Sequence, residues 1–98
     1  MSGFVGKLSL HVLWGRDLYR GPPGDMTQGP ASPYVVARYG GKKRKTPVAA
    51  DDAQPYWDTV LTFNLAKTED QLLELEGRDK RTLRDKSVGY YALDLRRV

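Results

Sequence analysis

Residues 55–65 restrict this chain to a β-rich fold. They hold a proline and two aromatic residues, followed by apolar and polar residues in alternation. The run begins Pro55-Tyr56-Trp57-Asp58, and Leu61, Phe63 and Leu65 then recur at every second position. Proline is tolerated at the first residue of a strand but not within a central one, so it marks the end of a loop. Alternation with a period of two is typical of a strand with one buried face. The segment predicts a strand over Trp57–Leu65.

The rest of the chain carries five more segments with strand character. They are Lys7–Val12 continuing to Trp14, Tyr34–Tyr39, Lys42–Val48, residues 72–76 and Val88–Leu95. Gly40-Gly41 between two of them is a hairpin signal. A short helix over Thr68–Leu75, capped by Thr68, is the competing interpretation of the fifth segment. The β context favours a strand there, and the spacing of turns predicts an antiparallel β-sandwich.

The same alternation predicts which side chains form the core. Leu8, Leu10, Val12 and Trp14 share one face of the first strand. Trp14 and Trp57 are expected in the core, and Tyr91, Leu93 and Leu95 share a face of the last strand. Residues 15–32, rich in glycine and proline, are expected to form a long loop.

The composition excludes several classes of function. The 98 residues suffice for one domain, and no apolar run reaches the ~20 residues of a membrane span. There is no cysteine, and His11 is the only histidine, expected at the surface. These facts argue against thiol or zinc chemistry, and no enzyme activity or cofactor is expected. Without a secretory signal, a cytoplasmic location is expected, peripheral to a membrane or the cytoskeleton.

The basic residues are bunched, and the net charge is +4. One cluster is Lys42, Lys43, Arg44 and Lys45, near Arg38, and the other is Arg78, Lys80, Arg81, Arg84 and Lys86. Clusters of this kind favour an anionic partner. Because side chains alternate along a strand, only half of residues 42–45 share a face.

Five motifs in order resemble the C2 domain family. Ser32-Pro33-Tyr34-Val35 is similar to the family's Asp-Pro-Tyr-Val, and Pro55-Tyr56-Trp57-Asp58 to its Pro-x-Trp-Asn. Gly6–Leu18, Lys45-Thr46 and the segment from Leu73 to Leu95 match the other three. The resemblance implies a Greek-key β-sandwich that docks on membranes or protein partners. It covers residues 1–98 as a single C2-like domain, expected to be the N-terminal module of a longer protein.

The resemblance also implies where calcium ligands would lie, and there the chain departs from the family. The corresponding positions are Asp25, Ser32, Asp79, Arg81 and Asp85, so two of the family's aspartates are replaced. Calcium takes about 6–8 oxygen ligands, and cations beside the site oppose its binding. We expect a degenerate site that holds no metal.

The family's sandwich has more strands than the segments found here, so the last strands are expected to be missing. An incomplete sheet leaves backbone groups free for pairing, which makes a strand-exchanged or edge-paired homodimer a hypothesis.

Two functions stay open on the sequence alone. One is calcium-independent targeting to anionic membrane lipids through both basic clusters. The other is a protein-interaction or scaffold module with an acidic partner and no lipid binding. Leu83 would either insert into a lipid or partner surface or fold back onto the core, the second being the usual fate of a lone loop leucine. Nucleic acid is not favoured, because no aromatic residue is interleaved with Lys42–Lys45 to stack on bases.

Overall fold

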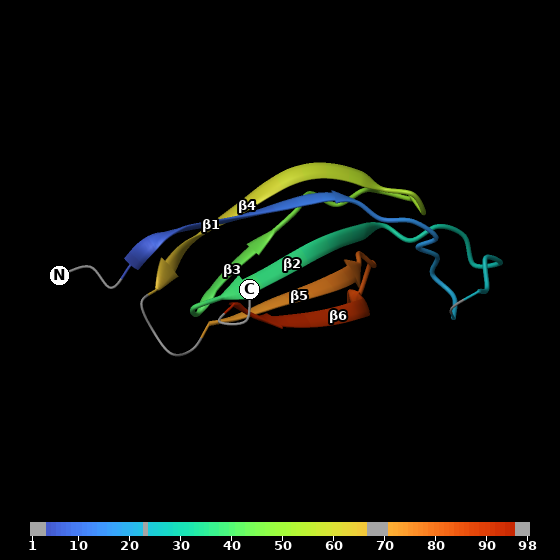
Figure 1. Cartoon of the computed structure of the whole chain (residues 1–98). Coiled ribbons are helices and arrows are strands. Elements are labelled where there is room, and N and C mark those ends of the chain that lie inside the picture. Colours follow the sequence, from blue (N-terminus) through green and yellow to red (C-terminus); the bar gives the residue numbers. More distant parts are fainter. Residues whose placement is uncertain (1–3, 23, 67–70, 96–98) are drawn as a thin grey trace.

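The computed structural model describes residues 4–22, 24–66 and 71–95, and these form two antiparallel sheets. One sheet pairs β1 (Phe4–Trp14) with β4 (Tyr56–Ala66). The other has the order β3-β2-β5-β6, built from Lys42–Lys45, Pro33–Tyr39, Leu72–Asp79 and Lys86–Asp94. Figure 1 shows the two layers, with β1 and β4 lying over the larger sheet. The predicted antiparallel β-sandwich is therefore confirmed.

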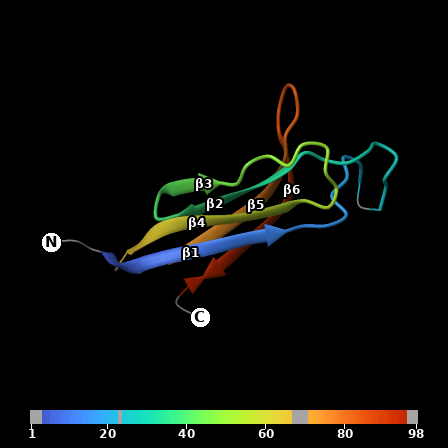
Figure 2. The same cartoon turned by 90° about the horizontal axis from the view of Figure 1, so that it is seen from above.

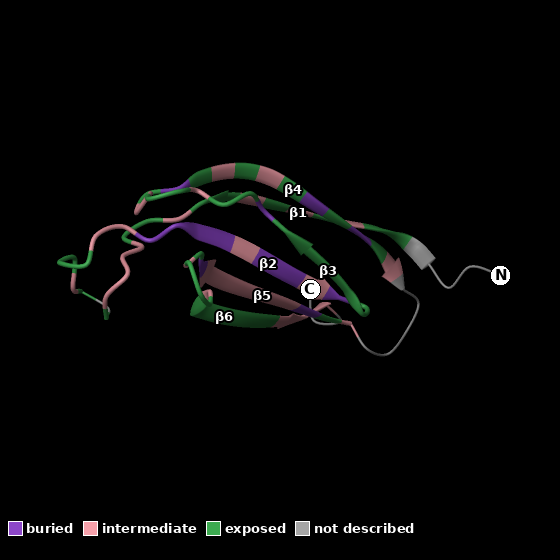
Figure 3. Cartoon of the chain, turned by 180° about the vertical axis from the view of Figure 1, so that it is seen from behind, coloured by how far each residue is buried: buried purple, intermediate pink, exposed green. Residues whose placement is uncertain are grey.

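The core lies between the two layers at β2. Its buried members are Ala37, Tyr39, Leu61, Phe63 and Leu73. The rings of Tyr39 and Phe63 meet edge to face, with centroids 5.9 Å apart. Leu8, Leu10 and Val12 pack against this cluster, as their alternation predicted. In Figure 3 the buried residues concentrate along β2, whereas β6 is exposed along most of its length.

Trp14 was wrongly predicted to lie in the core, since it is 59 % exposed. The pairing of β1 with β4 shifts between Val12 and Trp14, so that Leu13 faces both Trp57 and Asp58. Asp58 takes a left-handed backbone conformation with φ of 45°. Beyond this bulge of β4, Trp14 pairs with Tyr56, which is itself 68 % exposed, at the end of the two-stranded sheet.

One further strand prediction needs correction, and the strand predicted for the fifth segment is confirmed. The strand predicted over Lys42–Val48 ends at Lys45. At Thr46 the backbone N–H donates to the carbonyl of Val35, and the hydroxyl accepts the N–H of Val35 and donates to the carbonyl of Pro47, so the side chain takes part in the bonding. The fifth segment is a strand from Leu72 onward, so the helical alternative fails there; residues 68–70 lie outside the described residues. The Gly40-Gly41 hairpin is confirmed, with φ of 57° and 76° at its two glycines.

The last strand has the predicted face, but that face is only partly covered. Tyr91 pairs with Leu75 and Leu93 with Leu73, so both point toward the core side. Tyr91 is nevertheless 59 % exposed. Because the described part of the opposing sheet contains only β1 and β4, nothing in that part of the chain covers this end of β6.

Candidate functional site at the loop end of the sandwich

Ser32 joins three loops at one end of the sandwich. Its backbone N–H donates to Oδ1 of Asp79 at 2.8 Å, and its carbonyl accepts the N–H of Lys80 at 2.9 Å. Its hydroxyl oxygen accepts the N–H of Asp51 at 2.9 Å and Nη2 of Arg20 at 3.4 Å. The side chain of Ser32 is buried. A serine at the position where the resemblance implies an aspartate therefore acts as a structural connector.

Asp79 and Arg81 form an ion pair at the centre of this end. Nε of Arg81 donates to Oδ2 of Asp79 at 3.1 Å, and the Asp79 side chain has 0 % exposed surface. Nη2 of Arg81 also donates to the carbonyl of Arg20 at 3.2 Å. A buried carboxylate needs a charge partner and hydrogen-bond donors, and Arg81 and Ser32 supply them.

Asp85 closes the same loop from the other side. Its carboxylate accepts the hydroxyl of Tyr34 at 2.5 Å and the backbone N–H of Arg81 at 3.1 Å. These two bonds, the Tyr34 hydroxyl first, hold the pKa of Asp85 below its usual value. Burial and the same bond to Asp85 raise the pKa of Tyr34.

The structure brings four of the five expected calcium positions together. Ser32, Asp79, Arg81 and Asp85 contact one another, whereas the Asp25 carboxylate is engaged by Thr27. The Thr27 hydroxyl is the main reason why the pKa of Asp25 is lowered. Within residues 4–22, 24–66 and 71–95, no three or more His, Cys, Asp or Glu side chains are grouped so that they could hold a metal ion. The basic side chain of Arg81 lies at a position where the resemblance implies an acidic ligand.

Arg20 belongs to this site and was missed by the sequence reasoning. Its Nη2 pairs with Oδ1 of Asp51 at 3.1 Å, and its carbonyl holds Arg81. It lies in the long β1–β2 loop, where no motif marks it. Its partners are 12 to 61 residues away in the sequence, so local patterns contain no sign of them.

The β5–β6 loop projects from the sandwich, as Figure 2 shows. Leu83 in this loop is 99 % exposed. The expectation that it folds back onto the core was wrong, because Asp85 bends the loop onto Tyr34 and Arg81 instead. Lys80, Arg84 and Lys86 around it are exposed as well. We call Lys80, Arg81, Leu83, Arg84 and Lys86 the loop surface.

Arg78 has a different environment from the rest of its cluster. It lies on β5, where its guanidinium donates to the Tyr34 hydroxyl, the Glu76 carboxylate and the Asp85 carbonyl. The Tyr34 bond is the main cause of a raised pKa for Arg78. All of these contacts tie it to the outer face of the larger sheet.

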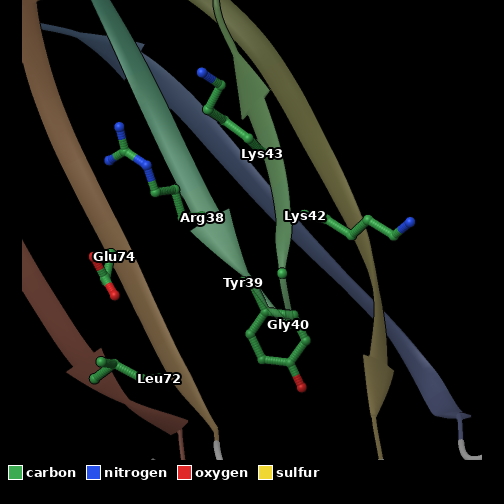
Figure 4. Close-up of a pocket in the computed structure, with 8 residues that line it drawn as sticks. Arg38, Tyr39, Gly40, Lys42, Lys43, Leu72 and Glu74 are labelled. Carbon is green, nitrogen blue, oxygen red and sulfur yellow. The ribbon is translucent and has the colours of Figure 1, made fainter.

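The second basic cluster lies at the β2–β3 hairpin, which sits at the opposite end of the sandwich (Figure 1). All four residues of β3 are exposed. Arg38, Lys42, Lys43 and Glu74 contribute to a pocket of about 420 Å³ there. Lys43 is paired with Arg38 on the outer face, and Figure 4 shows Lys42 extending to the other side of the strand. We call Arg38 and Lys42–Lys45 the hairpin surface.

Pairing already reduces the charge of the hairpin surface. Nη2 of Arg38 lies 3.2 Å from Glu76, whose carboxylate also holds Arg78. Glu76 has a lowered pKa, chiefly through a hydrogen bond from Ser87. The Arg44 guanidinium lies 5.5 Å from the centre of the Phe63 ring, on the core side of β3. Lys43 and Lys45 are therefore the cations of β3 on the outer face, which agrees with the expected alternation.

None of the described elements is a helix long and apolar enough to cross a membrane. His11 is exposed, as expected, and its Nε2 lies 2.6 Å from Oδ1 of Asp58.

Comparison with known proteins places this architecture in a family. The C2 domain family model matches residues 6–98. FT-interacting protein 1 of Oryza sativa subsp. japonica is 35 % identical over 93 % of this chain, and extended synaptotagmin-1 of Mus musculus is 32 % identical over 98 %. The chain spans only 11 % and 9 % of the length of these two relatives.

Solved structures show the same fold. The calcium-bound tandem C2 domains of extended synaptotagmin 2 superpose with a TM-score of 0.85 at 23 % identity, over 99 % of this chain and 37 % of that one. The motifs, the two-layer sandwich and the family match agree, and the chain is a member of the C2 domain family.

Proposed function

We propose that this C2 domain is a calcium-independent targeting module that binds anionic membrane lipids through its basic surfaces. The observation that carries the proposal is the loop surface, where a fully exposed leucine is flanked by Lys80, Arg81, Arg84 and Lys86 on a projecting loop. An apolar tip surrounded by cations suits the boundary between headgroups and acyl chains.

The magnitudes fit reversible docking. A basic residue close to an anionic leaflet contributes about 1 kcal/mol, so Lys80, Arg84 and Lys86, which have no buried carboxylate as ion-pair partner among the described residues, supply about 3 kcal/mol. Burying one leucine adds about 2 kcal/mol. Since the electrostatic part dominates, binding is expected to weaken steeply as salt rises.

Calcium independence is supported by the contacts of Arg81. In a calcium-dependent site, the metal would bridge carboxylates such as Asp79 and Asp85 to an anionic headgroup. Here Arg81 satisfies both carboxylates through Nε and its backbone N–H. A dication would have to displace a cation that is already hydrogen bonded.

The hairpin surface is the second contact proposed for the membrane. Lys43 and Lys45 lie on the outer face without an ion pair to any described carboxylate. Since the two basic surfaces lie at opposite ends, they would engage one flat membrane together only if the sandwich lies along it.

Vesicle co-sedimentation tests the proposal. The protein should bind vesicles that contain an anionic phospholipid, equally with calcium or a chelator, and should not bind neutral vesicles. The paired change Lys80→Gln with Arg84→Gln should weaken binding about tenfold or more. Lys7→Gln, an exposed charge on β1, is the control for net charge. Binding that needs calcium, or ignores lipid charge, overturns the proposal.

A protein partner is the second candidate, favoured by the free edge of β1. Within the described residues β1 pairs only with β4, so its other edge offers unpaired backbone groups. The edge could accept a strand from an acidic partner or from a second copy. Sedimentation velocity over a range of concentrations tests the homodimer, and a monomer throughout would exclude it.

A further inference from the structure

The loop end contains a pocket whose lining is cationic. It has a volume of about 510 Å³ and is lined by Arg20, Gln28, Lys80, Arg81 and Thr82. The lining contains three cations and no carboxylate. A volume of this size lies within the range of roughly 300–1,000 Å³ that is usual for small-molecule sites.

Two carboxylates that do not belong to the lining compensate the two arginines. Asp79, with no exposed surface, holds Nε of Arg81, and Asp51 holds Nη2 of Arg20. Lys80 is only loosely paired, with Nζ 3.8 Å from Asp85. The two arginines are therefore held by partners outside the lining, which lowers the entropy lost when they bind a ligand.

Donor groups remain for an anion. Nη1 of Arg81 and Nη1 of Arg20 make no hydrogen bond to any described residue. Nε of Arg20 is buried and has no partner within the described part of the chain. A buried donor without an acceptor is costly, so a ligand oxygen or a water molecule within reach would be favoured.

We propose that this pocket binds a phosphomonoester group through Arg20, Lys80 and Arg81. A phosphomonoester carries about two negative charges and three accepting oxygens. Two guanidinium groups and an ammonium supply charged donors for those oxygens, and guanidinium forks suit phosphate oxygens. The hydroxyl of Thr82 and the amide of Gln28 supply neutral donors at the rim. A phosphodiester has one charge and fewer terminal oxygens, and should bind less well.

The inference rests on the proposed function for the lipid source of the phosphate, since it names the headgroup that the loop surface would select. A soluble phosphomonoester has the same chemistry. The tests therefore treat the pocket and the membrane separately.

Nuclear magnetic resonance of the ¹⁵N-labelled protein tests the pocket with inorganic phosphate. Phosphate should shift the Nε–H signals of Arg20 and Arg81 and the amide of Thr82, whereas sodium chloride at matched ionic strength should not. Lys80→Gln should weaken phosphate binding on the order of tenfold, and Lys7→Gln should leave it unchanged. Because Arg81→Gln risks unfolding by leaving Asp79 unpaired, Thr82→Ala serves as the second pocket variant. Absence of saturable shifts at these three groups overturns the proposal.

Vesicles then distinguish the two sources. Phosphatidic acid has a monoester phosphate, whereas phosphatidylserine has a diester. If the source is a lipid, vesicles with phosphatidic acid should bind more tightly than phosphatidylserine vesicles of equal total charge, and inorganic phosphate should compete. Saturable phosphate binding without this preference assigns the pocket to a soluble phosphomonoester. Vesicle binding without any phosphate shift overturns the phosphate pocket but keeps the proposed membrane function. Phosphate shifts without vesicle binding keep the pocket and overturn the membrane function.

Discussion

Nε of Arg81 lies 3.1 Å from Oδ2 of Asp79, a carboxylate with no exposed surface. The resemblance to the family implies an acidic residue at the position of Arg81. The pair ties the β5–β6 loop to the end of β2, because the other oxygen of Asp79 accepts the N–H of Ser32. One ion pair thus joins two loops at this end of the sandwich.

Arg81→Asp should create a calcium site. The change places a third carboxylate near Asp79 and Asp85, and it removes the guanidinium that now pairs with Asp79, whereas the backbone N–H at position 81 can still donate to Asp85. Without calcium, repulsion among the three carboxylates should lower the melting temperature, and added calcium should restore it. Isothermal titration and thermal denaturation measure both effects. Arg84→Asp adds the same charge on the exposed part of the loop and should give no calcium binding; equal binding by the two variants would contradict this account.

Tyr34→Phe should reduce acid sensitivity at Asp85. The Tyr34 hydroxyl is the main cause of the lowered pKa of Asp85, so its removal should bring that pKa back toward the ordinary value. A lowered folded pKa contributes stability above about pH 4, and the contribution is lost as the pH falls through the folded pKa. The variant should therefore be less stable than the parent at neutral pH, with the gap narrowing in acid. Carbon-13 titration of the Asp85 carboxyl and urea unfolding at several pH values check this; an unchanged Asp85 pKa would refute it.

Phe63→Ala and Trp14→Ala should differ sharply in cost. Phe63 is 2 % exposed and contacts Tyr39, so its truncation should lower the free energy of unfolding by about 3–5 kcal/mol. Trp14 is 59 % exposed, and the Arg16 guanidinium lies 6.0 Å from its ring centre. Its truncation should cost about 1 kcal/mol or less. Urea denaturation of the two variants measures the difference, and equal costs would mean that Trp14 is buried.

Leu83→Ala should separate binding from stability. Since Leu83 is 99 % exposed, its truncation should change the free energy of unfolding by less than about 0.5 kcal/mol. If the loop surface enters the membrane, affinity for anionic vesicles should fall about tenfold. Val60→Ala, an exposed apolar change on β4, is the matched control and should leave vesicle binding intact. A loss of stability in Leu83→Ala would show that the leucine folds back after all.

Local pattern was sufficient for the strands and most of the core. The alternation of Leu8, Leu10, Leu61 and Phe63 predicted the faces on which they pack. It failed at Trp14, because the bulge at Asp58 depends on pairing between strands more than 40 residues apart. It also placed Tyr91 on the right face of its strand without deciding its burial, since burial requires an opposing layer that a strand's own pattern does not describe.

The sequence by itself determined the sandwich and the basic character of β3, and through the family resemblance it marked Ser32 and Arg81 as positions where acidic residues are expected. These features follow from the hydrophobic periodicity, the turn residues and the residue types, which are all properties of a few neighbouring positions. Only the tertiary structure decided that Arg81 covers Asp79, that Leu83 stands free and that Arg20 joins Lys80 and Arg81 around one pocket. Such contacts join loops far apart in the chain, and their geometry is set when the two sheets pack.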